Sequence, residues 1–164
     1  MGTIVFVTGV PSSGKSAVTR ELLALDASFR AVETDVEIRK AASDLDTPLN
    51  ARAIFLRVLD QVAELARSAN VVVDGSLPAS YVTEARDRFG EQAVFVTLQI
   101  AEVERRTREQ TRDDRKTIQW NEGLTALGGS PDLYDLVIDG LTKTPAECAA
   151  EILDAIGQPR EHRE

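Results

Sequence analysis

Short apolar runs alternate along the chain with longer segments in which apolar residues recur at helical spacing. The apolar runs of strand length cover residues 4–8, 30–34, 71–74, 93–99 and 133–138. The helical segments between and after them cover residues 15–25, 52–67, 81–89, 101–110 and 146–156. Because strands that alternate with helices form parallel sheets covered on both faces, this order predicts an α/β fold with three layers.

Some of these segments carry more specific signals. The runs VVV and AVFV are almost continuously apolar, which is typical of parallel strands buried on both faces. Ile54, Val58 and Val62 form one stripe of the longest helical segment, which predicts that this helix packs on the core. The sequence TPLN before it is a start signal, with Thr47 as the expected cap and Pro48 in the first turn.

Length and charge restrict the classes of function. The 164 residues suffice for one domain, predicted over residues 1–157, followed by a polar tail at 158–164. A formal net charge of −8 disfavours non-specific binding to nucleic acid or anionic membranes, because both need positive surface. Cys148 is the only cysteine, which excludes an internal disulfide and suits a reducing cytoplasm. The apolar N-terminal run is too short for a signal peptide or a membrane span. We therefore expect a cytoplasmic protein.

The sequence GVPSSGKS stands between the first strand and the first helix. Gly9 allows a sharp turn, and Gly14 lets main-chain N–H groups approach an anion without a Cβ in the way. The following helix N-terminus adds partial positive charge, Lys15 reaches the phosphates and Ser16 offers a hydroxyl to Mg²⁺. The motif in this context is the phosphate-binding loop of nucleoside triphosphatases. Its predicted nucleotide contacts are Gly9, Val10, Pro11, Ser12, Ser13, Gly14, Lys15, Ser16 and Ala17.

A carboxylate follows each of the next two predicted strands, Asp35 in VETDVEIRK and Asp74 in VVVDGS. In an open parallel sheet both would lie at the carboxyl ends of strands, beside the phosphate-binding loop. Phosphoryl transfer to a hydroxyl needs a base near the acceptor oxygen and a metal ion on the phosphates. Asp35 is therefore the candidate general base, and Asp74 with Ser16 the candidate magnesium site. The alternative for each carboxylate is that it only caps a helix or a turn.

Six cations gather within residues 105–116, namely Arg105, Arg106, Arg108, Arg112, Arg115 and Lys116. Arg108, Arg112 and Arg115 are spaced four and three residues apart, which places them on one helical face. We expect an arginine-rich lid over about residues 105–130, whose three aligned arginines stabilise the charge of the transition state. The alternative is a solvated helix with ion pairs at i,i+4 spacing.

At this point the chain resembles the chloramphenicol phosphotransferase-like small-molecule kinases, within the broader group of nucleotide and shikimate kinases. The matching segments are GVPSSGKS, TDVEI, VVVDG, the string RExxRxDR from Arg108 to Arg115, and the ending YDLVIDGLTKTPAECAAEI. The resemblance implies a five-stranded parallel sheet, ATP with Mg²⁺, Asp35 as base, and lid arginines of which Arg112 and Arg115 join Lys15 in catalysis. It also implies that the adenine contacts Thr142, Lys143 and Thr144. One departure is Gly75, which stands where the antibiotic-modifying member of the family has a second carboxylate after the strand.

The acceptor is expected between the segments that follow Asp35 and Asp74. Its predicted lining, beside these two carboxylates, is Val36, Arg39, Arg52, Phe55, Leu77 and Tyr81. The alternatives are a core position for Phe55 and surface positions for the two arginines. Nucleoside monophosphate kinases need several arginines to grip the acceptor phosphate, and only three are available here, so a neutral or singly charged acceptor is favoured.

The sequence thus predicts a kinase that moves the γ-phosphoryl group of ATP to a hydroxyl of a small molecule, with an antibiotic as a reasonable acceptor. Three alternatives remain open. One is a metabolite or nucleoside monophosphate kinase, similar to the gluconate, adenylylsulfate or shikimate kinases. Another is a toxin-like kinase that acts on nucleotide sugars. The third is a nucleotide-dependent switch without an acceptor, although no Asn-Lys-x-Asp guanine-reading segment is present. The oligomeric state is also open, a homo-oligomer included.

Overall fold

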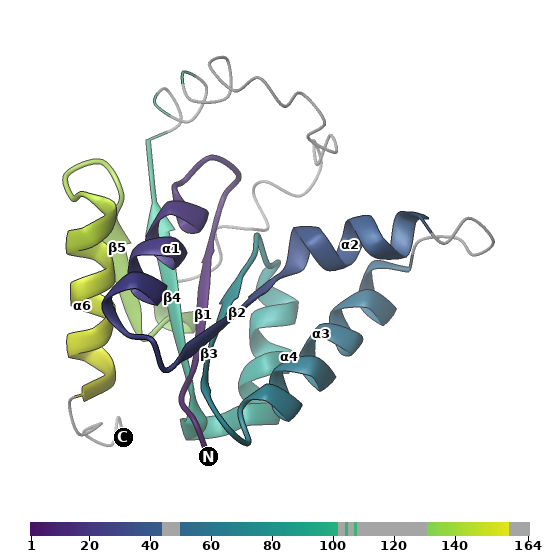
Figure 1. Cartoon of the computed structure of the whole chain (residues 1–164). Helices are drawn as coiled ribbons and strands as arrows, with labels where there is room; N and C mark the ends of the chain where they lie inside the picture. The colour runs from purple at the N-terminus through teal and green to yellow at the C-terminus, as the bar shows by residue number, and fades with distance from the viewer. Residues whose placement is uncertain (44–49, 102–103, 105–106, 108–130, 158–164) are drawn as a thin grey trace.

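Five parallel strands form one sheet in a computed structural model that describes residues 1–43, 50–101, 104, 107 and 131–157. The strand order is β2-β3-β1-β4-β5. The strands are β1 (Ile4–Gly9), β2 (Phe29–Glu33), β3 (Asn70–Asp74), β4 (Ala93–Gln99) and β5 (Leu136–Asp139). This confirms the predicted α/β fold and its five-stranded parallel sheet, which Figure 1 shows with all carboxyl ends at one edge.

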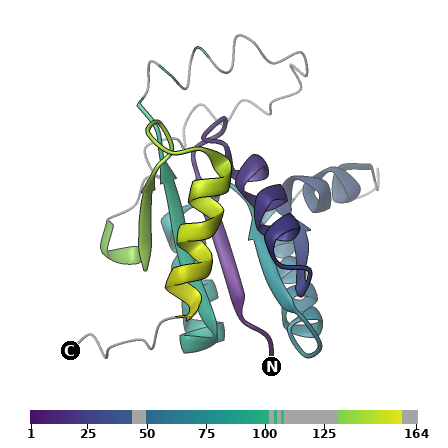
Figure 2. The same cartoon turned by 60° about the vertical axis from the view of Figure 1, so that its left-hand side comes forward.

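Helices cover both faces of the sheet, as expected for parallel strands. Their bounds are α1 (Lys15–Leu25), α2 (Thr34–Ser43), α3 (Ala51–Leu65), α4 (Ala79–Phe89) and α6 (Pro145–Gly157). α1 and α6 lie side by side on one face, and α3 and α4 lie on the other, as Figures 1 and 2 show from two directions. None of the helices in the described part of the chain has the length and apolar character needed to cross a membrane.

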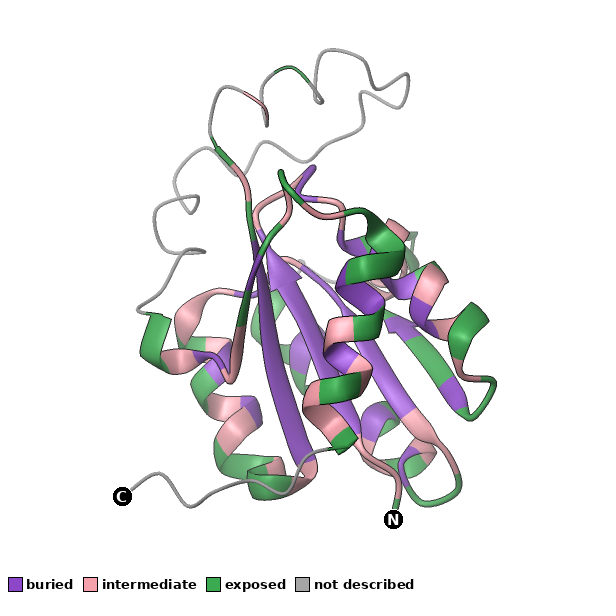
Figure 3. Ribbon diagram, turned by 90° about the vertical axis from the view of Figure 1, so that its left-hand side faces the viewer, coloured by how far each residue is buried: buried purple, intermediate pink, exposed green. Residues whose placement is uncertain are grey.

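Alternating side chains of the central strand β1 belong to two separate cores, one on each face of the sheet. Ile4 and Phe6 of β1 pack with α3 and α4, whereas Val5 and Val7 pack with α1 and α6. Every residue of β1 is buried, and Figure 3 shows the central strands buried between helices whose outer sides are exposed. Val58 and Val62 of the predicted stripe of α3 belong to the first of these cores, and Ile54 is buried beside α2. The continuous apolar runs therefore mark strands that are covered on both faces.

The chain between β2 and α3 differs from the prediction. β2 ends at Glu33, one residue earlier than expected, and residues 34–43 form the helix α2, which the periodicity did not indicate. The strand ends here because the Thr34 hydroxyl donates to the Asp74 carbonyl (3.2 Å), and Asp35 and Glu37 then lie in the first helical turn, where carboxylates are favoured. Thr47 and Pro48 fall outside the described residues, and Asn50 caps α3 with a side chain that accepts from the Ala53 N–H.

The last strand begins later than predicted. Residues Pro131–Leu133 form a short 3₁₀ helix, and β5 starts only at Leu136. The reason is Asp135, whose side chain accepts the Phe95 N–H (2.8 Å) that a longer strand would have paired. Arg86 of α4 holds the same carboxylate and also lies over the Phe95 ring, 4.4 Å from its centroid. The helix expected at 101–110 lies almost wholly outside the described residues.

Candidate active site

The phosphate-binding loop has the backbone that its glycines predict. Gly9 and Gly14 have φ angles of 144° and 99°, and Ser12 has a φ of 65°, the one positive value of a non-glycine residue in the described chain. A Cβ at Gly9 would lie 2.8 Å from the carbonyl oxygen of Leu98 and from Oγ of Ser13. A side chain there would therefore collide with β4 and with the loop itself.

Lys15 is buried within this loop. Its side chain is 8% exposed, and its ammonium donates to the carbonyl oxygens of Gly9 (3.2 Å) and Val10 (2.9 Å). The amides of the loop and this positive charge are gathered at the N-terminus of α1, which is the arrangement that binds phosphate. Ser13 at the base of the loop has a buried hydroxyl with no hydrogen-bond partner in the described structure. Oxygen-rich phosphate groups would fit a loop with this orphaned hydroxyl.

Asp74 at the end of β3 is brought together with two loop residues. Its side chain is 6% exposed, and burial, the largest cause, raises its pKa above the ordinary value. A hydrogen bond from the Ser16 hydroxyl and the charge of Lys15 act in the opposite direction. The predicted metal pair Ser16 and Asp74 is therefore brought together at this edge of the sheet, and a hydroxyl near a buried carboxylate is a donor set that suits Mg²⁺.

Two further carboxylates lie near Asp74. Asp35, in the first turn of α2, and Glu33, the last residue of β2, both raise the pKa of Asp74 through their negative charge. Glu33 stands directly opposite Asp74 in the sheet register. The sequence analysis did not select Glu33. Its position as the last residue of β2, two residues before Asp35, could have indicated that it lies near the site. No group of three or more acidic, histidine or cysteine side chains is close enough to ligate a metal directly, within the residues described.

Most predicted acceptor residues on α3, on α4 and in the segment before α4 serve the packing of the fold. Phe55 and Leu77 are each 4% exposed and belong to the core. Tyr81 stacks on Phe55, with ring centroids 4.5 Å apart and an interplanar angle of 13°. Arg52 binds Glu84 of α4 (3.1 Å). The core position is thus the alternative that the structure supports for Phe55.

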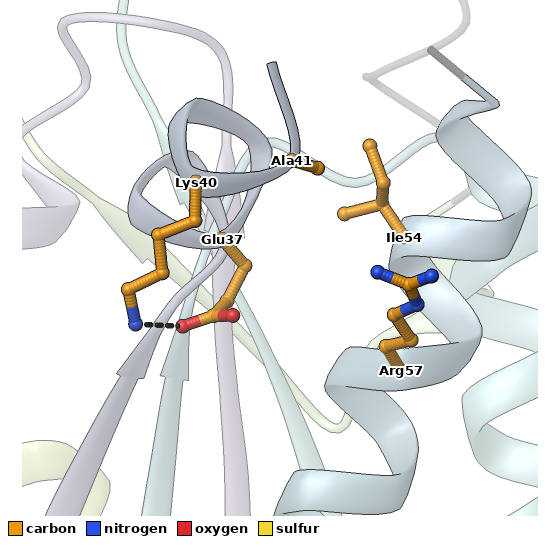
Figure 4. Close-up of a pocket in the computed structure, with 5 residues that line it drawn as sticks. All are labelled: Glu37, Lys40, Ala41, Ile54 and Arg57. Carbon is orange, nitrogen blue, oxygen red and sulfur yellow. Dashed lines mark hydrogen bonds and ion pairs between the residues drawn. The ribbon is translucent and has the colours of Figure 1, made fainter. Parts of the chain in front are cut away.

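On α2 the predicted acceptor residues are more accessible, since Val36 is half-buried and Arg39 is exposed. A pocket of about 80 Å³ opens between α2 and α3, and its lining is Glu37, Lys40, Ala41, Ile54 and Arg57 (Figure 4). Figure 4 shows the ion pair between Glu37 and Lys40 at its edge. The pocket contains none of the predicted acceptor residues, and its volume is well below the roughly 300 Å³ at which small-molecule sites begin.

The predicted adenine segment lies between β5 and α6. A Cβ at Gly140, where the segment begins, would approach the carbonyl oxygen of Ser13 to 3.3 Å, so the segment adjoins the phosphate-binding loop. Thr144 and Glu147 bond each other reciprocally at the start of α6, in the manner of a capping box. Lys143 pairs with Glu151, and this hydrogen bond raises its pKa. The lid residues Arg108, Arg112 and Arg115 lie outside the described part of the chain.

The model of the chloramphenicol phosphotransferase-like protein family matches residues 2–157. The chain belongs to this family. It is accordingly a phosphotransferase of the P-loop kinase type that acts on a hydroxyl of a small molecule, as the sequence predicted. No curated protein matches the chain in sequence.

Solved structures of two kinases and of an antibiotic-resistance protein share the fold. A sugar kinase from Janibacter sp. HTCC2649 superposes with a TM-score of 0.75 at 18% identity over 95% of both chains. The tunicamycin resistance protein of Deinococcus radiodurans gives 0.71 at 16% identity over 97% of this chain and 98% of that one. The APS kinase of Mycobacterium tuberculosis, solved with AMPPNP and APS, gives 0.68 at 21% identity over 96% and 98%. At these identities the likeness concerns the fold.

Proposed function

We propose that this member of the family transfers the γ-phosphoryl group of ATP to a hydroxyl of a small organic molecule, with Asp35 as general base. The observation that carries the proposal is Lys15, buried in the phosphate-binding loop and bonded to its carbonyls, with the buried Asp74 close to it and Asp35 within electrostatic reach. Phosphoryl transfer needs these elements together: cations on the phosphates, oxygen ligands for a metal and a carboxylate for the acceptor proton.

The nucleotide side uses the loop and the segment before α6. The loop amides and Lys15 would bind the phosphates, because both present N–H groups at the helix N-terminus. Ser16 and Asp74 would hold Mg²⁺, which when bound supplies positive charge that neutralises the phosphate oxygens. The adenine would contact Thr142, Lys143 and Thr144, which follow Gly140, the residue that lies beside Ser13 of the loop. The bound AMPPNP in the APS kinase neighbour supports a nucleotide site in this fold.

On the acceptor side Asp35 is exposed at the first turn of α2, so a substrate can reach its carboxylate. Asp35 would accept the hydroxyl proton as the acceptor oxygen bonds to the γ-phosphorus and the bond to the leaving ADP breaks. By the family pattern, Arg112 and Arg115 would stabilise the transferred group, and Arg108 would contact the nucleotide. Val36 and Arg39, the accessible members of the predicted lining, are the first candidates to touch the acceptor.

For the acceptor we propose a hydroxylated antibiotic, with a role in resistance or self-protection. The name of the family and the tunicamycin resistance protein among the structural neighbours support this choice. A metabolite kinase is the second candidate, because shikimate, gluconate and APS kinases share the fold at similar TM-scores. Gly75 stands where the antibiotic-modifying member of the family has a second carboxylate, so the acceptor pocket would differ from that member's, and the proposed transfer step needs no carboxylate at this position.

The test is phosphate transfer from Mg-ATP across a panel of acceptors. The panel holds chloramphenicol, tunicamycin, gluconate, shikimate, adenylylsulfate and the nucleoside monophosphates, with ADP release and the ³¹P spectrum of the product as readouts. A phosphomonoester formed on one antibiotic supports the proposal, and one formed on a metabolite supports the second candidate. Tight Mg-ATP binding without product on the whole panel would contradict both and favour a nucleotide-dependent switch.

A further inference from the structure

The end of β2 is tied to the end of β3 by one buried side chain. Thr34 is 6% exposed, and its hydroxyl donates to the carbonyl oxygen of Asp74 (3.2 Å). This bond lies just beyond the last pair of the two strands, in which Glu33 stands opposite Asp74. Thr34 is also the first residue of α2. One hydroxyl therefore joins the strand that carries Asp74 to the helix that carries Asp35.

Gly75 provides the space that Thr34 occupies. A Cβ at Gly75 would lie 2.2 Å from Oγ1, 2.8 Å from Cγ2 and 3.0 Å from Cβ of Thr34. These separations are too short for real atoms, so any side chain at position 75 would displace Thr34. The Gly75 N–H meanwhile donates to the carbonyl oxygen of Val7 at the end of β1 (3.2 Å). Residue 75 thus lies in a fixed backbone position, and the side chain of Thr34 would have to move.

The two carboxylates of the proposed reaction flank this contact. Asp35 follows Thr34 directly, and Asp74 supplies the carbonyl that Thr34 binds. A tie between their backbones opposes their separation. From this geometry we propose that Thr34 is a positioning residue that holds the Asp35 carboxylate in register with Asp74, and that Gly75 is required because it makes room for Thr34.

The expected fall in kcat rests on the proposed function. The expected change in the separation of the Asp35 and Asp74 carboxylates does not depend on it. A purely structural Thr34 would contribute only one buried hydrogen bond to the stability of the fold. A positioning residue would in addition lower turnover in the folded protein, because a small displacement of a base has a large effect on rate. The two roles can be separated by variants that differ in the hydroxyl alone.

The experiment compares Thr34→Val, which removes the hydroxyl at nearly constant shape, with Thr34→Ser, which keeps it. Thr83→Val is the matched control, since the hydroxyl of Thr83 also donates to a backbone carbonyl, that of Ala79 (3.1 Å), on the exposed side of α4. With the panel acceptor of highest turnover, Thr34→Val should lower kcat at least about tenfold and leave KM for ATP within about twofold. Thr34→Ser should restore kcat to within about threefold, and Thr83→Val should match the wild type. Equal kcat in the Val and Ser variants, or a loss that follows the unfolded fraction in urea titrations, would overturn the inference.

Crystal structures with Mg-AMPPNP provide a readout that needs no turnover. We expect the separation of the Asp35 and Asp74 carboxylates to increase in Thr34→Val and to stay unchanged in Thr34→Ser. An unchanged separation in Thr34→Val would refute the positioning role even if no acceptor is phosphorylated. Conversely, an increased separation in an enzyme that phosphorylates nothing would refute the proposed function and leave the positioning role standing.

The partnership of the two residues is tested by a double-mutant cycle. Gly75→Ala alone should lower kcat, because the new Cβ displaces the Thr34 side chain. In a Thr34→Ala background the atoms that it would strike, Oγ1 and Cγ2, are absent, so the same substitution should have a smaller effect. Additive effects of the two substitutions on kcat would show that Gly75 acts independently of Thr34.

Discussion

The nucleotide side and the acceptor side of the candidate site are built in different ways. The nucleotide side depends on backbone shape, with positive φ angles at Gly9, Ser12 and Gly14 and a lysine bonded to the carbonyls of its own loop. The acceptor side depends on side chains of α2, α3 and α4 that also pack the core or form ion pairs. A short motif is enough to specify the nucleotide side. The residues of the acceptor side can change wherever the core tolerates the substitution. A phosphate-binding loop can therefore be recognised from a few residues, whereas the side chains that would contact the acceptor cannot be told apart from those that only pack the core.

The largest expected effect comes from Phe55, a core residue of α3 that the sequence analysis placed in the acceptor lining. Phe55→Ala should lower the free energy of unfolding by about 3–5 kcal/mol, because it removes a buried ring that stacks on Tyr81. Urea denaturation measures the loss. Leu56→Ala, at a position 37% exposed on the same helix, is the control and should stay within about 0.5 kcal/mol. A tolerated Phe55→Ala with a raised KM for the acceptor would instead assign Phe55 to the site.

On the nucleotide side, Asp74→Asn should lower kcat by at least about 100-fold, the size expected when an electrostatic group is removed from a catalytic centre. The same substitution should stabilise the fold at neutral pH. Burial raises the pKa of Asp74, so the native state binds the proton more tightly than the unfolded chain does, and stability falls as pH rises through that raised pKa.

Urea titrations between pH 4 and pH 8 measure this second effect. The gap in stability between Asp74→Asn and the wild type should widen with pH, and Asp87→Asn, on the exposed side of α4, should show no such trend. A variant that is inactive and less stable than the wild type at every pH would contradict the account of Asp74.

Gly9→Ala tests the backbone of the loop. The substitution should lower the free energy of unfolding by about 1–3 kcal/mol, since it combines a φ of 144° with a Cβ 2.8 Å from the Leu98 carbonyl oxygen. Mg-ATP affinity should fall with it. Gly157→Ala, whose Cβ would meet no atom within 4 Å, is the control. Thermal melts with and without Mg-ATP measure both effects. Equal melting temperatures for Gly9→Ala and Gly157→Ala would contradict the steric clash proposed at Gly9.

The smallest effect is expected at the ion pair between α3 and α4. Arg52→Ala should lower the free energy of unfolding by less than about 1 kcal/mol, because the Arg52 side chain is 67% exposed and its pair with Glu84 is screened by water. If Arg52 serves the acceptor, KM for that acceptor rises while Glu84→Ala leaves it unchanged. If both substitutions raise it equally, the pair acts by holding α3 against α4.

The sequence was most informative where local rules decide the structure. The alternation of apolar runs predicted the parallel sheet, and the bounds of α1 and β4 agree with it, because buried parallel strands and a motif-led helix need little tertiary context. The motif also predicted the loop, and the pairing of Ser16 with Asp74 followed from the common edge of the sheet.

Tertiary contacts decided the rest. Residues 34–43 were not predicted as a helix, because β2 ends through a bond from Thr34 to a carbonyl forty residues away in sequence. β5 was shortened by Asp135, which takes the Phe95 N–H. A phenylalanine at position 55 is compatible with either a pocket or a core, and only the packing of the folded chain shows that it lies in the core. Glu33 lies in no recognised motif, and only the register places it opposite Asp74.

Turnover of the Asp35→Asn variant tests the central claim most directly. With the best panel acceptor and saturating Mg-ATP, kcat should fall by at least about 100-fold, the lower range for loss of a general base. The dissociation constant of Mg-ATP should stay within about twofold, and Asp154→Asn on the exposed side of α6 should behave as the wild type. A variant that binds Mg-ATP and keeps the wild-type kcat would contradict the assignment of Asp35 as the base.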